Sequence, residues 1–546
     1  MKSFQIPKTC HVDIITPLLT DFYQITMAYS YFKNNRHEQP SSFELFFRNC
    51  PFKGEVYNIL QINFFFKTKI KQYAICAGLH EVISFIHTYK IPEDHIQFLS
   101  TQIQNIDPEF QNWLRNLNCS KIQLYAQKEG SICFAKVPLL RLEGPIGLLQ
   151  LLETPLLNLM NFATLISTNA CRIKREAGEN AKCLEFGLRR AQGPDGGLMA
   201  SQFSYLGGFD GSSNVLAGIK YKIPISGTMA HSFITSYSNL DQIIEFEING
   251  IKIKETTLQY RNQLNYVNSS DSELAAFLDY AKSCYNNFTC LIDTFDTISS
   301  GIQNFICVSL ALIQAGINPK GVRLDSGDLA KLSIQVRQQL DELADLFKVE
   351  QFKNVQIIAS NDLNQESIKK LNQQGHKINV FGVGTNLVTC QNQPALGGVY
   401  KLVELNKEPK HKLSQDAEKS TLPGCKNVYR IWTYKSQYPV ADVISKSNQE
   451  IKEGQTIFVV NFHQPSQRYK VLVNKVELIL NLVYDQGQLL TEYQSLQQCK
   501  QFCQQQQIMF NQEVLNDKQK YMVLCTIEYY QFFQDCNEKI IINMVL

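Results

Sequence analysis

Short apolar runs alternate with amphipathic stretches through the middle of the chain. From about residue 166 the runs end in small or polar residues, and they stand at 183–186, 223–227, 291–293, 322–325, 355–360 and 380–383. A helical period is clearest at 302–315, 329–347 and 365–373. Strands that alternate with helices pair in parallel, which predicts an α/β sheet or barrel. Barrels place their chemistry at the carboxyl ends of strands, where polar residues fall here; a doubly wound sheet would show a similar pattern.

The flanking parts of the chain follow other patterns. In the first third, residues 43–47 predict a strand and residues 78–86 the start of a helix. Beyond about residue 401 the chain is lysine-rich, then strand-like, and then glutamine-rich at 497–506. No internal repeat is evident, and we interpret the glutamine run as a solvated helix.

Composition narrows the class of protein. The 546 residues exceed one ordinary core and indicate two or three domains. A net charge of only +3, with dispersed Lys and Arg, argues against nucleic acid as a partner. The apolar stretch 148–168 is interrupted by Glu153 and Pro155, which predicts a buried helix and no membrane span. Sixteen scattered cysteines without a Cys-x-x-Cys pair, and no signal-peptide core in residues 1–16, predict a cytosolic protein.

Two glycines lie at the carboxyl end of the strand predicted at 380–383. Gly382 and Gly384 let backbone N–H groups approach an anion, and a helix that begins at Thr385 would add its dipole. The segment is not a Walker loop and lacks the third glycine of a dinucleotide fingerprint. Barrel phosphate sites cluster after the last strands. The segment therefore predicts a phosphate site, with a tight strand-to-helix turn as the alternative.

Arg323 and Asp325 lie two residues apart on another predicted strand. Alternation along a strand places both side chains on the same side. The guanidinium could bind a carboxylate or phosphate in a bidentate manner, and the carboxylate could bind ribose hydroxyls or steady positive charge. The alternative is a structural ion pair, with Asp328 as the cap of the next helix.

Two further segments combine polar side chains with a strand end or a turn. His231, with Thr228 and Ser232 nearby, could carry a proton or act as a nucleophile, although a lone histidine is more often structural. The segment 188–197 joins two arginines to a glycine-rich turn. It predicts either diphosphate binding or salt bridges at a domain or subunit contact.

Taken together and in this order, these segments resemble the nicotinate phosphoribosyltransferase family. The similar stretches are 17–24, 43–48, 188–197, 205–218, 227–236, 321–328, 382–385 and 397–402. The similarity runs from about residue 16 to about residue 424, and more weakly beyond. Each stretch is weak evidence alone, whereas their ordered conjunction is specific.

The resemblance implies an irregular α/β barrel plus an α/β domain built from the N- and C-terminal segments. The expected boundaries are an N-terminal α/β domain at 1–165, the barrel with the active site at 166–405, and a C-terminal segment at 406–546 that completes the first domain. Members of the family are usually homodimers with active sites at the subunit interface. Tyr23 is therefore a candidate to serve the site of the partner subunit.

Roles for individual residues are also implied by matching position. Tyr23, Thr228 and Arg323 match the nicotinate contacts, where Tyr23 would stack on the pyridine ring and Arg323 would hold the carboxylate. His231 matches the histidine that ATP phosphorylates, and Asp325 and Asp293 are further catalytic candidates. The residues expected to bind 5-phosphoribosyl 1-diphosphate are Thr385, Gly382, Gly384, Ser326 and Gly327.

The implied reaction is an ATP-dependent ligation in NAD biosynthesis, which joins nicotinate to 5-phosphoribosyl 1-diphosphate and yields nicotinate mononucleotide and diphosphate. Diphosphate leaves through an oxocarbenium-like state, so the site must stabilise separated charges more than supply a strong base. Mg²⁺ (or Mn²⁺), held largely by diphosphate oxygens with a carboxylate such as Asp293 or Asp325, would neutralise the leaving group. The sequence does not identify the metal ligands.

Three other functions are less compatible with the sequence. The nicotinamide-using relative also resembles the chain around His231, but an Asp there matches Asn214 here, and a neutral side chain is compatible with an acidic substrate. Quinolinate phosphoribosyltransferase is disfavoured because its relatives are much shorter and bind a dicarboxylate. A non-catalytic homologue is disfavoured because Tyr23, His231, Arg323 and Thr385 are all present.

Residues 56–72 interrupt the spacing of the family. They include three consecutive phenylalanines and a basic run, and their removal restores the usual distance between Gly54 and Tyr73. Val56 requires a codon that begins with GT, and Gln72 can be encoded by CAG, or by TAG in a code that reads it as glutamine; both fit splice boundaries. The stretch is thus either a translated intron or an ordinary surface insertion, which transcript sequencing distinguishes.

Overall fold

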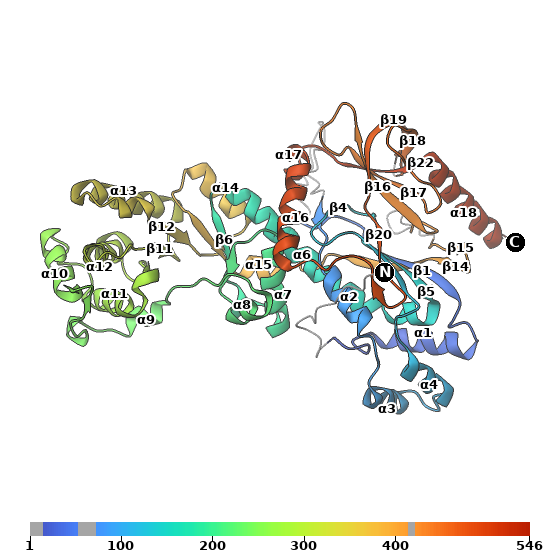
Figure 1. Cartoon of the computed structure of the whole chain (residues 1–546), viewed down its shortest axis with the longest axis horizontal. Helices are drawn as coiled ribbons and strands as arrows, with labels where there is room; N and C mark the ends of the chain where they lie inside the picture. The colour runs from blue at the N-terminus through green and yellow to red at the C-terminus, as the bar shows by residue number, and fades with distance from the viewer. Residues whose placement is uncertain (1–14, 53–72, 413–420, 463, 546) are drawn as a thin grey trace, which may run out of the picture. The chain divides into compact units, whose positions relative to one another are not determined.

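The computed structural model describes residues 15–52, 73–412, 421–462 and 464–545, so the 56–72 insertion lies outside the described residues. The chain forms two compact units. Unit 1 contains residues 1–168, 206–208 and 392–546, and unit 2 contains residues 169–205 and 209–391. Figure 1 shows the elements of each unit along the chain.

Unit 2 is built on a parallel sheet with the strand order β10-β11-β12-β13-β6-β7. The last strand of the unit, β13, pairs with its first, β6, and Ser212 of β7 forms a parallel bridge with Ile225. No strand pair among the described residues joins the Ile225 segment to β10, so the α/β barrel is irregular and open on that side. Its strands are β6 (Lys182–Glu185), β7 (Gly211–Ser212), β10 (Thr289–Leu291), β11 (Gly321–Leu324), β12 (Gln356–Ala359) and β13 (Val380–Val383).

Helices surround this sheet, and three of them confirm the periodic stretches read from the sequence. α12 (Ile302–Gln314), α13 (Leu329–Phe347) and α14 (Gln365–Gln374) follow β10, β11 and β12. Asp328 caps α13 by accepting the N–H of Lys331, and Asn364 begins α14 with a capping box. The other helices of this unit are α7 (Gly193–Leu206), α8 (Val215–Tyr221), α9 (His231–Thr235), α10 (Ile253–Gln263), α11 (Asp271–Cys284) and α15 (Thr385–Thr389).

The core of unit 2 lies between the sheet and these helices. Val322, Leu324 and Ile357 of the sheet are fully buried with Phe305 and Leu312 of α12. One helical stretch, Thr297–Gln314, has the length and composition of a membrane span, but 72% of it is buried inside the structure. That burial is typical of a core helix.

Unit 1 contains a seven-stranded sheet with the order β15-β14-β1-β5-β3-β20-β21. The predicted strand at 43–47 is an interior strand of this sheet, β1 (Pro40–Phe47), antiparallel to β14 (Gly398–Leu405) and β5 (Leu140–Pro145). β14 therefore belongs to unit 1, and the predicted boundary at residue 405 is wrong because the chain leaves unit 2 after residue 391. The remaining strands are β3 (Gln123–Ala126), β15 (Glu408–Pro409), β20 (Asn481–Asp485) and β21 (Gln488–Leu489).

Helices cover this sheet, and the helix start predicted at residue 78 is confirmed by α2 (Leu79–His87). The long helix α6 (Glu153–Ala177) contains most of the apolar stretch 148–168, whose leucines are buried as expected except Leu157, which is partly buried. The other helices of unit 1 are α1 (Phe22–Lys33), α3 (Glu93–Gln102), α4 (Pro108–Asn116), α5 (Ile146–Leu151), α16 (Leu496–Met509), α17 (Gln512–Leu515) and α18 (Ile527–Val545).

The C-terminal segment forms a closed barrel that the sequence pattern did not predict. Its strands pair in the order β16-β17-β22-β18-β19, with bounds β16 (Lys426–Thr433), β17 (Ala441–Lys446), β18 (Thr456–Asn461), β19 (Gln464–Leu478) and β22 (Met522–Thr526). The glutamine run lies in α16, where Cys499, Cys503 and Gln506 are buried. The interpretation as a solvated helix is therefore only half right, because one face of α16 packs inside unit 1.

Two buried ion pairs stabilise this part of unit 1. Lys426 lies 2.7 Å from a carboxylate oxygen of Glu44, and Arg430 lies 2.9 Å from Asp442. Burial raises the pKa of Glu44 and lowers that of Lys426, while their mutual attraction opposes both changes. Both cations are thus structural.

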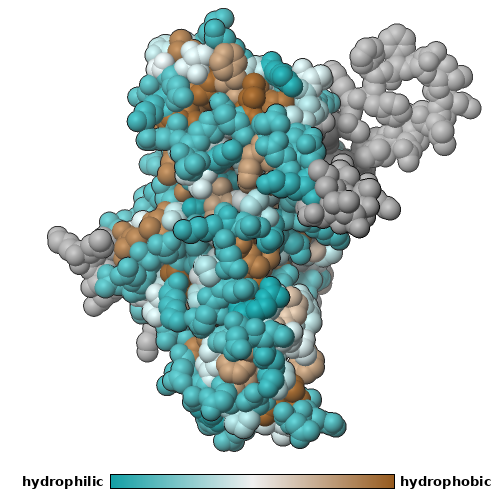
Figure 2. Space-filling model, turned by 90° about the vertical axis from the view of Figure 1, so that its right-hand side faces the viewer, coloured by the Kyte–Doolittle hydropathy of each residue, from teal (hydrophilic) through white to brown (hydrophobic). Residues whose placement is uncertain are grey.

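Hydrophilic residues cover most of the molecular face shown in Figure 2. On the face shown in Figure 2, apolar residues gather in small patches separated by hydrophilic ones. Scattered patches of this kind are usual for folded proteins.

Candidate active site

Polar side chains gather at the carboxyl edge of the parallel sheet in unit 2. β10 and β11 pair in parallel, with Leu291 opposite Arg323, so the residues that follow β10 meet the end of β11. β12 pairs on the other side of β11 and is followed by Ser360. The register thus brings Asp293, Arg323, Asp325 and Ser360 to one edge, which confirms that the polar residues fall at strand ends.

Arg323 is held by four neighbours. Its Nε–H donates to the Ser360 hydroxyl over 2.7 Å, and Nη2 donates to Oδ1 of Asp325 over 2.9 Å. Nη1 donates to the carbonyl of Met229 at 3.3 Å and to the Thr228 hydroxyl at 3.5 Å. The side chain is only 15% exposed. The alternatives of ion pair and anion site are compatible, since a guanidinium positioned in this way can still face a ligand.

Asp293 joins the ends of β10 and β11. Its Oδ2 accepts the backbone N–H of Asp325 at 2.7 Å and the Ser326 hydroxyl at 2.6 Å. Its Oδ1 is buried and has no hydrogen-bond partner among the described residues. An unsatisfied buried carboxylate oxygen is costly, so this atom is a candidate ligand for a cation or a substrate hydroxyl.

His231 lies at the start of α9, beside Asp325 and Thr294. Its Nδ1 is 3.1 Å from the hydroxyl of Thr294, and its Nε2 is 3.8 Å from Oδ2 of Asp325. The ring is 44% exposed, so a ligand can reach it. The histidine therefore lies between two polar neighbours at the site and is not a buried core residue.

The glycine-rich segment after β13 makes close contacts. A Cβ on Gly382 would lie 2.5 Å from the ring of Phe186, so only glycine fits there without displacing the aromatic ring. Thr385 begins α15, and its hydroxyl accepts a hydrogen bond from Nη1 of Arg190 at 3.1 Å. This contact brings the arginine-rich segment and the predicted phosphate segment together.

Phe186 is a site residue that the sequence analysis did not identify. It directly follows β6, and its ring centre lies 5.9 Å from the Arg323 guanidinium. The sequence signal was an aromatic residue at the carboxyl end of a parallel strand, which appeared there only as part of an apolar run. The ring can provide an apolar face beside a fixed positive charge.

Behind Phe186 lies a buried polar cluster centred on Glu185. Its carboxylate accepts the N–H of Gly187 and the hydroxyls of Ser201 at 2.9 Å and Ser212 at 2.5 Å. Asn214 donates its amide to Ser201 at 3.1 Å and caps α8 by accepting the N–H of Ala217 at 3.3 Å. Both polar atoms of the Asn214 side chain are therefore used inside the protein.

The remaining predicted residues are placed as follows. Ser326 and Gly327 lie in the turn after β11, where Gly327 has φ +77° and Ser326 binds Asp293. Gly384 precedes α15. Tyr23 lies on α1 in unit 1 and is 49% exposed. Among the described residues, no group of three or more His, Cys, Asp or Glu side chains is arranged to hold a metal ion.

Comparison with known proteins adds independent evidence. The family model described as the nicotinate phosphoribosyltransferase (NAPRTase) family matches residues 181–450, and models of the N-terminal and C-terminal domains of such proteins match residues 18–161 and 425–533. The nicotinate phosphoribosyltransferase of Dictyostelium discoideum is 46% identical over 505 residues, which are 90% of this chain and 83% of that protein. The Homo sapiens nicotinate phosphoribosyltransferase is 39% identical and covers 89% of this chain and 90% of its own.

A solved structure is also similar along almost the whole chain. The crystal structure of human nicotinic acid phosphoribosyltransferase superposes with a TM-score of 0.82 and 34% sequence identity. The superposition covers 94% of this chain and 99% of the human one. The similarity therefore includes both units and is not confined to a shared motif.

Proposed function

This chain belongs to the nicotinate phosphoribosyltransferase family, and we propose that it couples the transfer of phosphoribose onto nicotinate to ATP by way of a phosphohistidine. The transfer itself is the activity of the family. The observation that supports nicotinate as the acceptor best is Arg323, a guanidinium fixed by Ser360 and Asp325 at the carboxyl edge of the sheet. Such a group binds a carboxylate strongly and discriminates against a neutral amide.

Different residues around Arg323 suit different parts of the two substrates. The ring of Phe186 offers an apolar face near the guanidinium, which suits the pyridine ring of nicotinate. Gly382, Gly384 and Thr385, with Arg190 bonded to Thr385, suit the phosphate groups of 5-phosphoribosyl 1-diphosphate. With these groups bound, the anomeric carbon and the pyridine nitrogen would lie among fixed polar groups that stabilise the developing charges.

A divalent cation fits the acidic side of the site. Asp293 has a buried Oδ1 without a partner among the described residues, which suits Mg²⁺ or Mn²⁺ or a water molecule bound to it. When bound, the cation would neutralise the charge of the leaving diphosphate. Asp293 also orients Asp325 and Ser326 through its other oxygen.

His231 is the residue we propose to accept the phosphoryl group of ATP. It is half exposed and lies beside Thr294 and Asp325, so it is both accessible and oriented. Phosphorylation of a histidine stores part of the free energy of ATP hydrolysis, which would drive an otherwise reversible transfer toward the mononucleotide. We place this reaction in NAD biosynthesis in the cytosol, in agreement with the scattered thiols of the sequence.

The direct test is an assay with the purified protein. The protein would receive 5-phosphoribosyl 1-diphosphate, Mg²⁺ and ATP, and mononucleotide formation would be followed with nicotinate or with nicotinamide. We expect product from nicotinate and a higher yield with ATP. Product from nicotinamide alone would overturn the assignment, and binding without turnover would indicate a non-catalytic homologue.

We also propose a homodimer in which Tyr23 completes the site of the partner subunit. Large apolar side chains are exposed on α1 and around α8, as an interface would require. If so, mixing inactive Tyr23→Ala and Arg323→Ala subunits should restore part of the activity, because one mixed site then has both native residues. Mixtures that stay inactive although mass spectrometry detects mixed dimers would contradict this role of Tyr23. The exposed residues are Leu19, Phe22, Tyr23 and Met27 in unit 1, and Leu188, Val215, Leu216, Ile219 and Ile225 in unit 2.

Asn214 provides a test of substrate choice. Because both polar atoms of its side chain are bonded inside the protein, we propose that it acts on the substrate through its lack of charge. Asn214→Asp keeps a helix cap but adds a second carboxylate beside Glu185, so we expect the ratio of kcat/KM for nicotinate to that for nicotinamide to fall about tenfold, the equivalent of ~1.4 kcal/mol. Asn214→Ser, which can cap the helix without charge, is the control. An unchanged ratio in Asn214→Asp would refute the proposal.

A further inference from the structure

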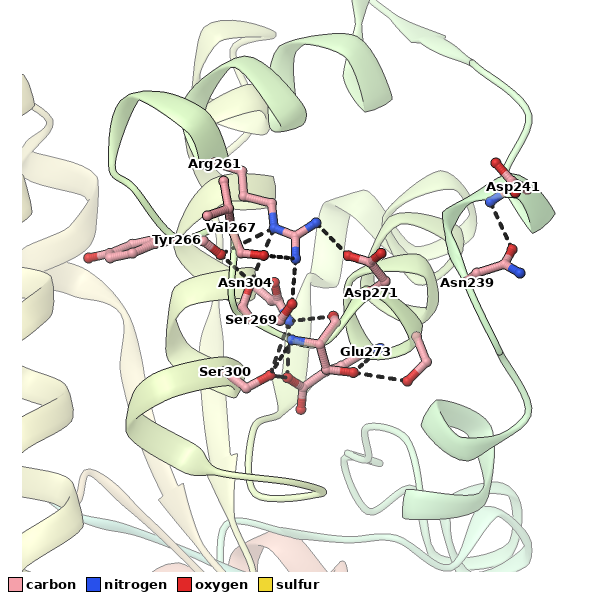
Figure 3. Close-up of polar contacts among 12 residues, drawn as sticks. Asn239, Asp241, Arg261, Tyr266, Val267, Ser269, Asp271, Glu273, Ser300 and Asn304 are labelled. Carbon is pink, nitrogen blue, oxygen red and sulfur yellow. Dashed lines mark hydrogen bonds and ion pairs between the residues drawn. The ribbon is translucent and has the colours of Figure 1, made fainter.

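A buried polar network lies among α10, α11 and α12 in unit 2 (Figure 3). We refer to it as the Glu273 network. Glu273 and Asn304 are fully buried, and the other members are at most 6% exposed. Its members are Arg261, Ser269, Glu273, Ser300 and Asn304. Burying a polar group without a hydrogen-bond partner destabilises the fold. The hydrogen bonds of each member therefore show which segments the network holds in place.

Glu273 is the centre of the network. Its Oε2 accepts the hydroxyl of Ser300 at 2.6 Å and the amide of Asn304 at 3.1 Å. The Asn304 oxygen accepts the hydroxyl of Ser269 at 2.7 Å, and that hydroxyl lies 3.2 Å from Nε of Arg261. The carboxyl group of α11 is thereby tied to the start of α12 and to the turn before it.

The turn before α12 has an unusual backbone. Residues Thr297–Gly301 form a π-helix, and Asp296 caps it by accepting the N–H groups of Ile298 at 3.0 Å and Ser299 at 2.6 Å. A Cβ on Gly301 would lie 1.9 Å from the carbonyl oxygen of Ile292, so the turn rests directly on the end of β10. Turns of this type occur frequently at functional sites.

The same segment leads into the active site. Ile292, against which Gly301 packs, is followed by Asp293, which binds the Asp325 N–H and Ser326. The next residue, Thr294, contacts His231 at 3.1 Å. A shift of the π-helix would therefore displace Asp293 and Thr294 together.

We propose that Glu273 is a positioning residue of the active site, which acts through Ser300 and Asn304 on the π-helix and hence on Asp293 and Thr294. It does not touch the substrates. The proposal rests on the proposed function in one respect, since its readout is turnover of nicotinate and 5-phosphoribosyl 1-diphosphate.

The groups around Glu273 determine the pH at which its carboxyl group ionises. Burial raises the pKa of Glu273 to about 7, its hydrogen bonds from Ser300 and Asn304 oppose the rise, and Asp293 and Asp296 add to it. β10 contributes the Cys290 thiol, whose pKa burial and Glu273 raise. The nearby Arg261 is paired with Asp271 at 2.6 Å. Glu273 is thus neutral at pH 6 and ionised above about pH 7, where its charge lies close to the acidic residues of the site.

The sign of the stability effect follows from the raised pKa. A carboxyl group whose pKa is higher in the folded than in the unfolded chain stabilises the fold fully below its ordinary value of 4.5. That stabilisation declines as the pH rises from 4.5 and is lost above about 7. Glu273→Gln removes the titration and keeps an oxygen that can accept both hydrogen bonds.

The test compares three variants of the full chain. Glu273→Leu removes the acceptor of the Ser300 hydroxyl and leaves the Asn304 amide bonded to the Ser270 carbonyl. We expect kcat/KM for 5-phosphoribosyl 1-diphosphate to fall about tenfold or more. Glu273→Gln should keep wild-type activity at pH 6. Asp271→Asn, on the same helix but bonded only to the outer part of the network, is the control and should change activity less than about twofold.

The pH profile separates positioning from mere structural support. The ratio of wild-type to Glu273→Gln kcat/KM should fall as the pH passes about 7. Thermal unfolding should show a larger loss of stability between about pH 4.5 and 7 in the wild type than in Glu273→Gln, which keeps the titration of the buried Glu129. A constant ratio, or a Glu273→Leu enzyme with normal kcat/KM and only a lower Tm, would overturn the proposal. If the wild type itself makes no product, the proposed function fails instead.

Discussion

Replacing Arg323 by alanine is expected to lower kcat/KM for nicotinate by about 100- to 1,000-fold. Removing one partner of a hydrogen-bonded charge pair in a partly buried site costs roughly 3 to 4 kcal/mol, and each ~1.4 kcal/mol corresponds to a factor of ten. The variant also removes the guanidinium donor of Asp325 and of Ser360, and leaves the Asp325 carboxylate bonded to the Ser360 hydroxyl at 2.5 Å. Steady-state kinetics with varied nicotinate would measure the loss.

Two matched variants make this result specific. Arg323→Lys keeps the charge but loses the planar fork, so it should recover only a small part of the activity. Arg337→Ala removes another mostly buried arginine, which binds the carbonyls of Phe352 and Val355 just before the amino end of β12. That variant should lose stability and keep its KM for nicotinate. A normal KM in Arg323→Ala would refute the role of Arg323 in binding the carboxylate.

Replacing His231 by alanine is expected to abolish the stimulation by ATP and to leave a slow transfer without ATP. In the proposed mechanism the imidazole, which is 44% exposed, is the nucleophile, and Arg323 and the segment at 382–385 would bind the substrates without it. The measurement is the product yield with and without ATP, together with acid-labile incorporation of phosphate from labelled ATP.

His376→Ala is the control for this experiment. His376 lies in the same unit, where it accepts the N–H of Ile378 and contacts Asn372. This variant should retain both ATP stimulation and phosphate incorporation. Phosphate incorporation that persists in His231→Ala would move the phosphorylated residue elsewhere, and its absence in the wild type would contradict the coupling itself.

Local pattern was sufficient for many elements of the fold. α12, α13 and α14 were predicted within a residue or two of their bounds, because their apolar residues recur with the helical period and residues such as Asp328 and Asn364 cap them. Five parallel strands of unit 2 (β6, β10, β11, β12 and β13) were also predicted, because strands buried on both faces are short continuous apolar runs. The short strand β7 was missed, and the predicted run at 223–227 forms only a bridge at Ile225.

Pairing between segments that are far apart in the sequence could not be predicted from the local pattern of residues. The closed C-terminal barrel depends on pairs such as Ala441 with Met522, which are far apart in sequence. The boundary error near residue 405 has the same cause, since β14 joins unit 1 only by pairing with β1. Lys426 and Arg430 are structural because they pair with Glu44 and Asp442, and these pairings are visible only in the folded chain.

By itself the sequence determined the family, the alternation of strands and helices in unit 2, and most of the polar residues at the strand ends, since all of these depend on residue type and spacing along the chain. Only the tertiary structure decided which side chains meet: Phe186 beside Arg323, Arg190 on Thr385, and Glu273 behind the turn that positions Asp293. Each of these contacts joins segments that are separated along the chain. The register of the parallel strands and the packing of buried helices set such contacts, and neither is a local property of the sequence.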